Sequence, residues 1–199
     1  MSRTEMGITP MEALCLQLLN SERYDYRGDG QLIEDQLYQP GWLEALLKRW
    51  DLTLEHASPQ EGLPILSVLR SRLRPLVECL NQGQDLSEKD LALLNDALNA
   101  VPRRRLVVHN GKMYTLQEEP LRKDWLWVEA EIIASFVAML EHDPLRIKIC
   151  ENPHCRWIYY DESPNHTRRW CEDTCANMMR VRRFREKKRA HDFSPPLAH

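Results

Sequence analysis

Hydrophobic residues recur every three to four positions in five segments of the first 145 residues. The segments span residues 11–20, 41–50, 65–80, 87–100 and 124–142. This is the period of an amphipathic α-helix, so the sequence predicts five helices that share a core. Ser87 and Asp90 resemble a capping box at the start of the fourth helix. Pro75 removes a backbone donor, which predicts a kink or restart in the third.

The period changes between the fourth and fifth segments. Leu106–Val108 and Met113–Leu116 are β-rich and flank Asn110-Gly111, a strong signal for a two-residue hairpin turn. Arginines 103–105 precede the first strand, and we expect them on a solvated edge rather than on a phosphate. The polar stretch 21–31 is predicted to be a loop.

Four residues stand out on the helical segments. Asn20 is expected to cap a helix or to cross-link the core, a structural role. Arg70 is expected to be solvated or salt-bridged rather than anion-binding. Cys15 and Cys79 lie on apolar faces, where small core residues are the expectation.

The other four cysteines form two close pairs near the C-terminus. Cys150 and Cys155 are separated by four residues, Cys171 and Cys175 by three, and fifteen residues lie between the pairs. Two short loops that each supply two thiolates are a common way to bind zinc in a tetrahedron. So short a segment cannot bury enough apolar surface to fold alone, so we predict one structural Zn²⁺ bound by these cysteines.

The residues around the cysteines predict a small α+β unit. Residues 156–160 are aromatic and predict a strand, 163–165 a turn, and 168–170 a second strand that returns to the metal. A helix then begins near Asp173 and carries Cys175 in its first turn. The fold prediction is therefore a mainly α (α+β) chain, with a helical N-terminal domain, one β-hairpin, and a treble-clef-like finger.

The helix after Cys175 is strongly cationic. Met178, Val181 and Phe184 recur every three residues, so we expect them to pack on the aromatic residues of the hairpin. Nucleic-acid contact and a solvated charged face are both open interpretations of the remaining faces. The candidate nucleic-acid-binding residues are Arg168, Arg169, Arg180, Arg182, Arg183, Arg185, Lys187, Lys188 and Arg189.

The finger resembles the CGNR zinc-finger family, whose members carry the finger behind a helical domain called ABATE. The matching positions are Cys150, Cys155, Asp161, Ser163, Asn165, Arg168, Arg169, Trp170, Cys171, Cys175 and Asn177. Ala176 and Met178 stand where the family signature has glycine and arginine. The stretch 14–20 resembles the opening of ABATE, with Gln17 at a position where aspartate is usual. The family is described as stress-induced transcription regulators, so the resemblance implies DNA as a partner.

Charge is unevenly distributed along the 199 residues, whose net charge is −3. Residues 150–199 carry ten basic and seven acidic side chains, and residues 1–149 carry 17 and 23. Repulsion from the acidic N-terminal part should leave the C-terminal helix as the contact with nucleic acid.

We expect three parts: a helical ABATE-like domain at 1–145, a finger with its basic helix at 146–191, and a disordered tail at 192–199. Residues 11–19 are too short and too polar for a secretory signal, and no stretch approaches a membrane span. We therefore expect a cytoplasmic protein with reduced thiols and without a membrane partner.

Three functions remain open on this evidence. The first is a transcription regulator whose finger binds DNA and whose helical domain senses a small-molecule effector or forms a homodimer. The second is a protein-interaction module in which zinc only stabilises the chain end. The third, a ligand-binding or enzymatic helical domain, has the least support, because no nucleophile motif is present and a closed four-thiolate site leaves no position for water. We therefore predict no enzyme activity and no catalytic residues.

Overall fold

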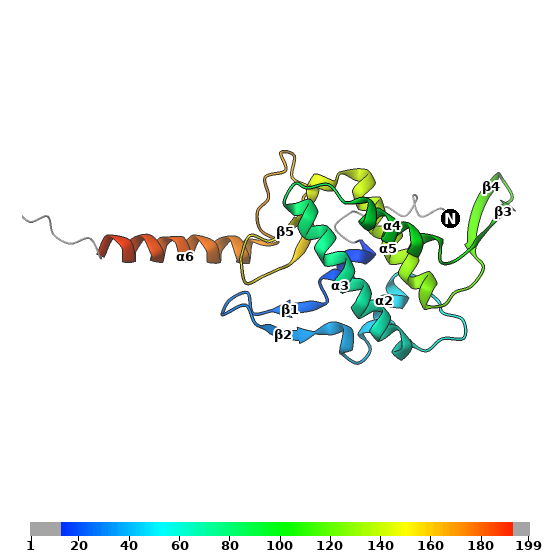
Figure 1. Cartoon of the computed structure of the whole chain (residues 1–199), viewed down its shortest axis with the longest axis horizontal. Helices are drawn as coiled ribbons and strands as arrows, with labels where there is room; N and C mark the ends of the chain where they lie inside the picture. The colour runs from blue at the N-terminus through cyan, green and yellow to red at the C-terminus, as the bar shows by residue number, and fades with distance from the viewer. Residues whose placement is uncertain (1–12, 193–199) are drawn as a thin grey trace, which may run out of the picture.

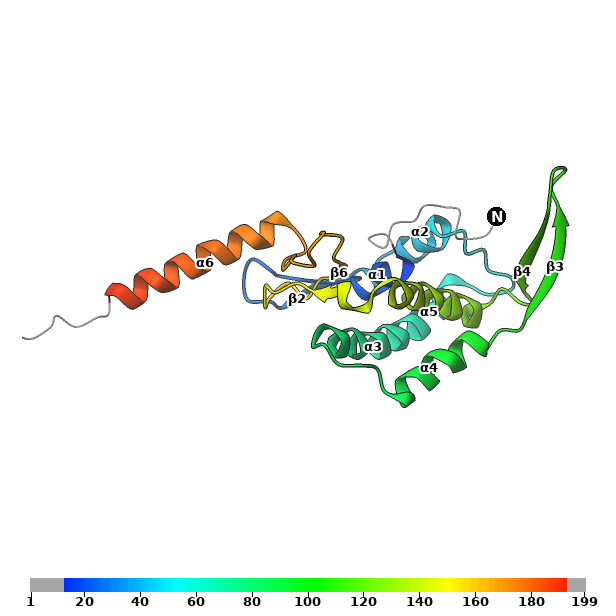
Figure 2. The ribbon, with the colours of Figure 1, turned by 90° about the horizontal axis from the view of Figure 1, so that it is seen from above.

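The structure is a computed structural model that describes residues 13–192, and the side chains up to Arg189. Met11, assigned above to the first helix, and residues 193–199 of the expected tail lie outside the described residues. A body of packed helices occupies the centre, α6 projects from one end, and the β3–β4 hairpin projects from the other (Figures 1 and 2). In the described part of the chain, no helix combines the length and apolarity needed to cross a membrane.

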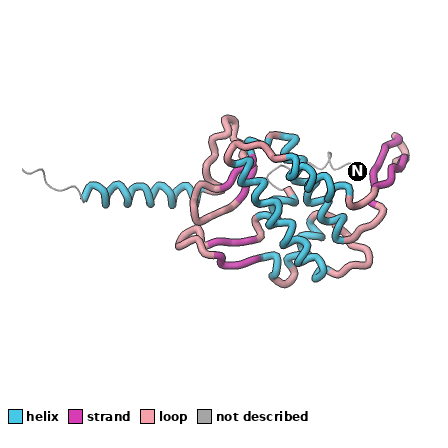
Figure 3. The backbone as a smooth tube through the Cα atoms, viewed as in Figure 1, coloured by secondary structure: helices cyan, strands magenta, loops and turns pink. Residues whose placement is uncertain are grey.

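The described elements alternate long helices with short antiparallel pairs of strands (Figure 3). In chain order they are α1 (Leu14–Leu19), β1 (Glu22–Tyr24), β2 (Leu32–Asp35), η3 (Gln36–Tyr38), α2 (Trp42–Arg49), η4 (Pro59–Glu61), α3 (Gly62–Asn81), α4 (Glu88–Asn99), β3 (Arg103–His109), β4 (Tyr114–Pro120), α5 (Trp125–His142), η5 (Pro144–Arg146), β5 (Ile147–Ile149), β6 (Ile158–Tyr160) and α6 (Asp173–Asp192). The mainly α prediction is therefore confirmed, with a four-cysteine cluster near the C-terminus.

The core lies where α5 packs against α1, α3 and α4. Phe136 of α5, Leu18 of α1 and Leu69 of α3 are all fully buried there. On each of these helices the buried residues recur every three to four positions, because only a continuous stripe can face a common core. The capping box at Ser87 and Asp90 is also present at the start of α4.

Two predictions about local structure were wrong. Residues 21–31 do not form a simple loop, because β1 pairs antiparallel with β2 and frames a turn. Of the kink or restart predicted at Pro75, the restart was wrong, since α3 continues through this residue. A proline removes one donor, and the buried stripe on both sides of Pro75, including Leu73 and Leu76, holds α3 in place.

The predicted hairpin exists, but its strands are longer and its turn is wider than expected. Residues 103–109 pair with 114–120, so the arginines belong to the ladder. The connection has four residues, and the side chain of Asn110 accepts hydrogen bonds from the amides of Lys112 (3.2 Å) and Met113 (3.0 Å). Arg104 and Arg105 lie on a solvated edge, as expected, and pair with Glu119 and Glu118.

The C-terminal segment docks tightly on the body. Ile147 and Ile158, from β5 and β6, are buried in the same core as the helices. The Asn20 side chain donates to the carbonyl of Ile158 and accepts from its amide, both at 2.8 Å. Asn20 is therefore the cross-link that its position suggested, and it joins α1 to β6.

Candidate metal centre and nucleic-acid interface

The first cysteine pair lies on a turn between two paired strands. β5 pairs antiparallel with β6, and the amide of Cys150 donates to the carbonyl of Trp157 at 2.8 Å. The amide of Cys155 donates to the carbonyl of Asn152 at 2.9 Å, which tightens the turn. A strand was predicted at 156–160, and β6 forms its last three residues. Its predicted partner was wrong, because β6 pairs with the segment before Cys150 instead of with residues 168–170.

Residues 168–170 form no strand, yet they return the chain to the metal centre as expected. The amide of Glu151 donates to the carbonyl of Arg169 at 2.9 Å, and the Tyr159 hydroxyl donates to the carbonyl of Arg168 at 2.8 Å. Cys171 follows directly, and Cys175 lies in the first turn of α6. Two bonds thus align the second cysteine pair with the first.

The four sulfur atoms form a compact cluster. All lie within 4.8 Å of one another, with 3.5 Å from Cys155 to Cys171 and 3.8 Å from Cys171 to Cys175. Zinc–sulfur bonds of about 2.3 Å in a tetrahedron place neighbouring sulfurs about 3.8 Å apart. The donor set and its spacing therefore fit one zinc ion with no open position.

The crowded thiols perturb one another. Hydrogen bonds from Cys155 and Cys171 lower the pKa of the Cys150 thiol to about 2. Contact with Cys150 raises the pKa of Cys155, and Cys150 and Cys155 together raise that of Cys171. Neighbouring thiolates repel, so a divalent cation is what allows all of them to ionise together, and its binding releases protons.

Asn152 links the metal centre to two other parts of the chain. It is fully buried, and its amide nitrogen lies 3.5 Å from the sulfur of Cys175 and 3.1 Å from the carbonyl oxygen of Tyr26, in the β1–β2 turn. Its oxygen accepts from Arg182 of α6 at 3.2 Å. A donor of this kind orients and stabilises a thiolate ligand. Asn152 was not predicted from the sequence. The one sign of its role was a polar side chain in the turn between Cys150 and Cys155.

Asp161 is the buried anchor of the loop between the two cysteine pairs. Its carboxylate accepts from the Lys148 ammonium (2.7 Å), the Ser163 amide (2.9 Å) and the Arg168 amide (3.1 Å). Burial opposes ionisation of Asp161, but these donors outweigh it and lower its pKa to about 2. Asp161 therefore holds the returning segment against β5.

We expect Asp161→Asn to destabilise the chain by about 2 to 3 kcal/mol at neutral pH, because the charge that these donors stabilise is lost. The folded-state pKa lies below the unfolded value of about 3.9, so this contribution is present above about pH 4 and disappears as the pH falls through about 2. Denaturant unfolding of both proteins across this range measures it. Exposed Glu162→Gln is the control, and an equal effect of both substitutions would contradict this role.

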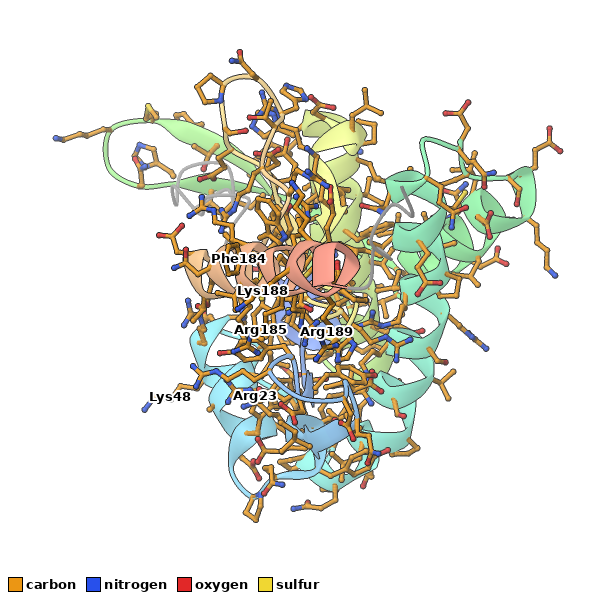
Figure 4. The ribbon with its side chains drawn as sticks, turned by 90° about the vertical axis from the view of Figure 1, so that its left-hand side faces the viewer. Arg23, Lys48, Phe184, Arg185, Lys188 and Arg189 are labelled. Carbon is orange, nitrogen blue, oxygen red and sulfur yellow. The ribbon has the colours of Figure 1, made fainter. Side chains whose placement is uncertain are left out.

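The predicted cationic residues fall into two groups. Three are engaged by the finger: Arg168 donates to the carbonyls of Trp170 and Cys171, Arg169 pairs with Glu151, and Arg182 donates to Asn152. The others lie exposed on α6: Arg180, Arg183, Arg185, Lys187, Lys188 and Arg189. Viewed from its free end, α6 carries Arg185, Lys188 and Arg189 above Arg23 and Lys48 of the body (Figure 4).

The expected packing was wrong for two of the three apolar residues on α6, whereas Met178 is half-buried. Val181 is 47% exposed and Phe184 is 69% exposed. The three-residue spacing suggested a buried face, but α6 projects from the body (Figure 1), so this face meets no core formed by the described residues. An exposed phenylalanine among cations is therefore a feature of the α6 surface.

Comparison with protein families agrees with this architecture. Residues 146–188 match the family model of the CGNR zinc finger. Residues 12–143 match the ABATE family, whose description is "Putative stress-induced transcription regulator". No curated protein matches the chain. The ABATE match spans most of the chain, and the finger match contains all four clustered cysteines, so the finger holds one structural zinc ion. The chain therefore belongs to the ABATE family of transcription regulators and carries a C-terminal CGNR zinc finger.

Proposed function

We propose that this regulator binds duplex DNA through α6, and that Cys150, Cys155, Cys171 and Cys175 ligate the zinc that holds the helix in place. The main support for this proposal is the exposed cationic surface of α6. The helix projects from the metal centre, and its outer half is clear of the body (Figure 1). Arginine and lysine on a free helix attract the phosphate backbone, and an α-helix of about 10–12 Å diameter fits the major groove.

Helix geometry supports a different role for each face of α6. Arg182 points to the body, because its guanidinium donates to Asn152 and to the carbonyl of Gly28. Successive residues rotate by about 100°, so Phe184 lies on the opposite side and Asn177 lies close to it on the wheel. Lys188 lies within this outward face, and the other exposed cations flank it on both sides. The base edges would then meet Phe184, Val181 and Asn177, while the flanking cations would contact phosphates.

These residue types favour sites that contain A·T pairs. An asparagine amide can bond adenine with two hydrogen bonds, and apolar side chains contact the thymine methyl group. Asn177 accepts a hydrogen bond from Arg180 at 3.1 Å, which holds its amide at the edge of the outward face. The phosphate contacts would supply affinity, and the residues of the outward face would supply the preference for particular base pairs.

The test is a titration of zinc-loaded protein into random-sequence duplex DNA over a range of salt. Neutralisation of about six phosphates gives a log–log slope of about −5. Arg183→Ala and Arg185→Ala should each reduce its magnitude by about 1, whereas Arg72→Ala on α3, exposed and far from α6 along the chain, should not. Arg182→Ala is a poorer probe, because it also removes the contact with Asn152. Unchanged slopes in both α6 variants would exclude the helix from the contact.

A selection from duplexes with a randomised centre tests the assignment of the outward face. The wild type should enrich A·T-containing sites, and Phe184→Ala should lose that enrichment while its salt-dependent binding persists. Enrichment that Phe184→Ala leaves unchanged would contradict this part of the proposal. The absence of any binding at low salt would instead favour a protein-interaction role for the finger.

Effector sensing by the helical part has one structural feature in its favour. An open groove of about 560 Å³ lies where the end of α3 meets the finger. Its lining includes Asn81 of α3, Lys148 of β5, and His166 and Arg168 of the loop that leads to Cys171. A small molecule bound there would touch both parts of the chain, which is what a sensor of this architecture requires.

A further inference from the structure

The β3–β4 hairpin stands away from the helical body. It crosses the end of the molecule opposite α6 (Figure 2). At its base Arg103 pairs with Glu131 of α5 at 2.6 Å, but the strands extend well beyond this anchor. A two-stranded hairpin is at best marginally stable by itself in water. Its extension into solvent therefore indicates a surface that is completed by a partner.

One face of the hairpin is both apolar and exposed. Directly opposed residues share a face, and the pairs in question are Val107 with Leu116 and His109 with Tyr114. Val107 is 73% exposed, Leu116 65% and Tyr114 75%, and the rings of His109 and Tyr114 stack at 4.4 Å. The intervening residues on the other face are less exposed. The outward face therefore carries the contiguous apolar surface.

We propose that this outward face is a homodimer interface, on which two copies of the chain pack face to face about a two-fold axis parallel to the strands. Such an axis places β3 of one copy over β4 of the other. Val107 then meets Leu116 of the second copy, and His109 meets Tyr114. Arg103 belongs to the same face and is anchored to α5, so the two copies meet through the part of the strands that extends beyond this anchor.

Charge complementarity favours a second copy as the occupant. The same face carries Arg105 and Glu118, opposed to each other at the base of the apolar pairs. In the two-fold arrangement Arg105 of each copy faces Glu118 of the other, so the surface complements itself. The proposal does not depend on DNA binding, and its test contains no DNA.

The first experiment measures the mass of the zinc-loaded full chain by light scattering and sedimentation over a range of concentrations. The wild type should be dimeric, and Val107→Lys should weaken the dimer by at least about 100-fold, because two buried charges would face apolar side chains. Ile33→Lys, a substitution on β2 at a site of similar exposure (67%), should leave the dimer unchanged. A monomeric wild type, or equal effects of both variants, would overturn the proposal.

A charge-reversal pair tests the geometry and guards against misfolding. Arg105→Glu and Glu118→Arg should each weaken the homodimer by about tenfold, through like charges placed in opposition. An equimolar mixture of the two variants should restore dimers, because every crossed contact is again between opposite charges. Damage confined to each hairpin could not be repaired by mixing. Failure of the mixture to form a heterodimer would therefore overturn the two-fold arrangement.

Discussion

Removal of zinc is expected to melt the finger and to release α6 while the helical body stays folded. Structural zinc in small fingers contributes about 10–16 kcal/mol of apparent binding free energy, and the segment has little core of its own. Its own cluster consists mainly of Cys150, Tyr159 and Cys175, with Tyr26 of the β1–β2 turn packed against it. The body should survive, because Ile147 and Ile158 belong to the main core.

Hydrogen exchange with and without a chelator measures whether the finger and α6 unfold while the helical body stays folded. Amides in the first turns of α6, from about residue 175, should lose protection, whereas those of α3 and α5 should keep it. Cys171→Ser should reproduce the effect and lower bound zinc below one ion per chain. Cys79→Ser is the matched control, because Cys79 lies on α3 away from the four-sulfur cluster. Protection of α6 that survives chelation would show that the metal does not hold the helix.

The helices could be predicted from the sequence because each buries a single stripe. Leu14, Leu18 and Leu69 lie on such stripes, and which residues share a stripe depends only on their spacing within one helix. The β1–β2 pair could not be predicted in this way. Its residues Glu22, Arg23 and Tyr24 all carry polar groups, so no alternation of hydrophobic and polar residues marks them as a strand. They form a strand because β1 pairs with β2, a segment several residues further along the chain.

The metal centre could be predicted because two close pairs of cysteines are by themselves a typical zinc-binding pattern. The partner of β6 was not, since Tyr159 and Tyr160 indicate a strand but say nothing about its neighbour. Phe184 illustrates a second limit. Periodicity predicts which residues share a face of a helix, but only the three-dimensional arrangement decides whether that face meets a core, and α6 projects away from one.

Replacement of Arg70 by methionine is expected to destabilise the body by about 3 to 5 kcal/mol, the usual cost of breaking a buried ion pair by removal of one partner. The Arg70 side chain is only 7% exposed. It donates to both carboxylate oxygens of Asp35, at 2.7 and 2.5 Å, and to the hydroxyl of Ser21 at 2.5 Å, and it lies 3.4 Å from Glu22. This network confirms the salt-bridged role expected for Arg70.

The expected cost comes from the groups that Arg70 would leave behind. Methionine fills a similar volume, but Glu22 and Asp35 would remain close together with no cation, at the junction of α1, the β1–β2 pair and α3. Chemical denaturation of the zinc-loaded protein measures the change, and Arg72→Met, an exposed position on the same helix, is the control at about 0.5 kcal/mol or less. Adding Glu22→Gln and Asp35→Asn to Arg70→Met should recover part of the loss, because the unpaired charges are then removed. If the triple variant were no more stable than Arg70→Met, the cost would lie in packing around the guanidinium and not in its charge.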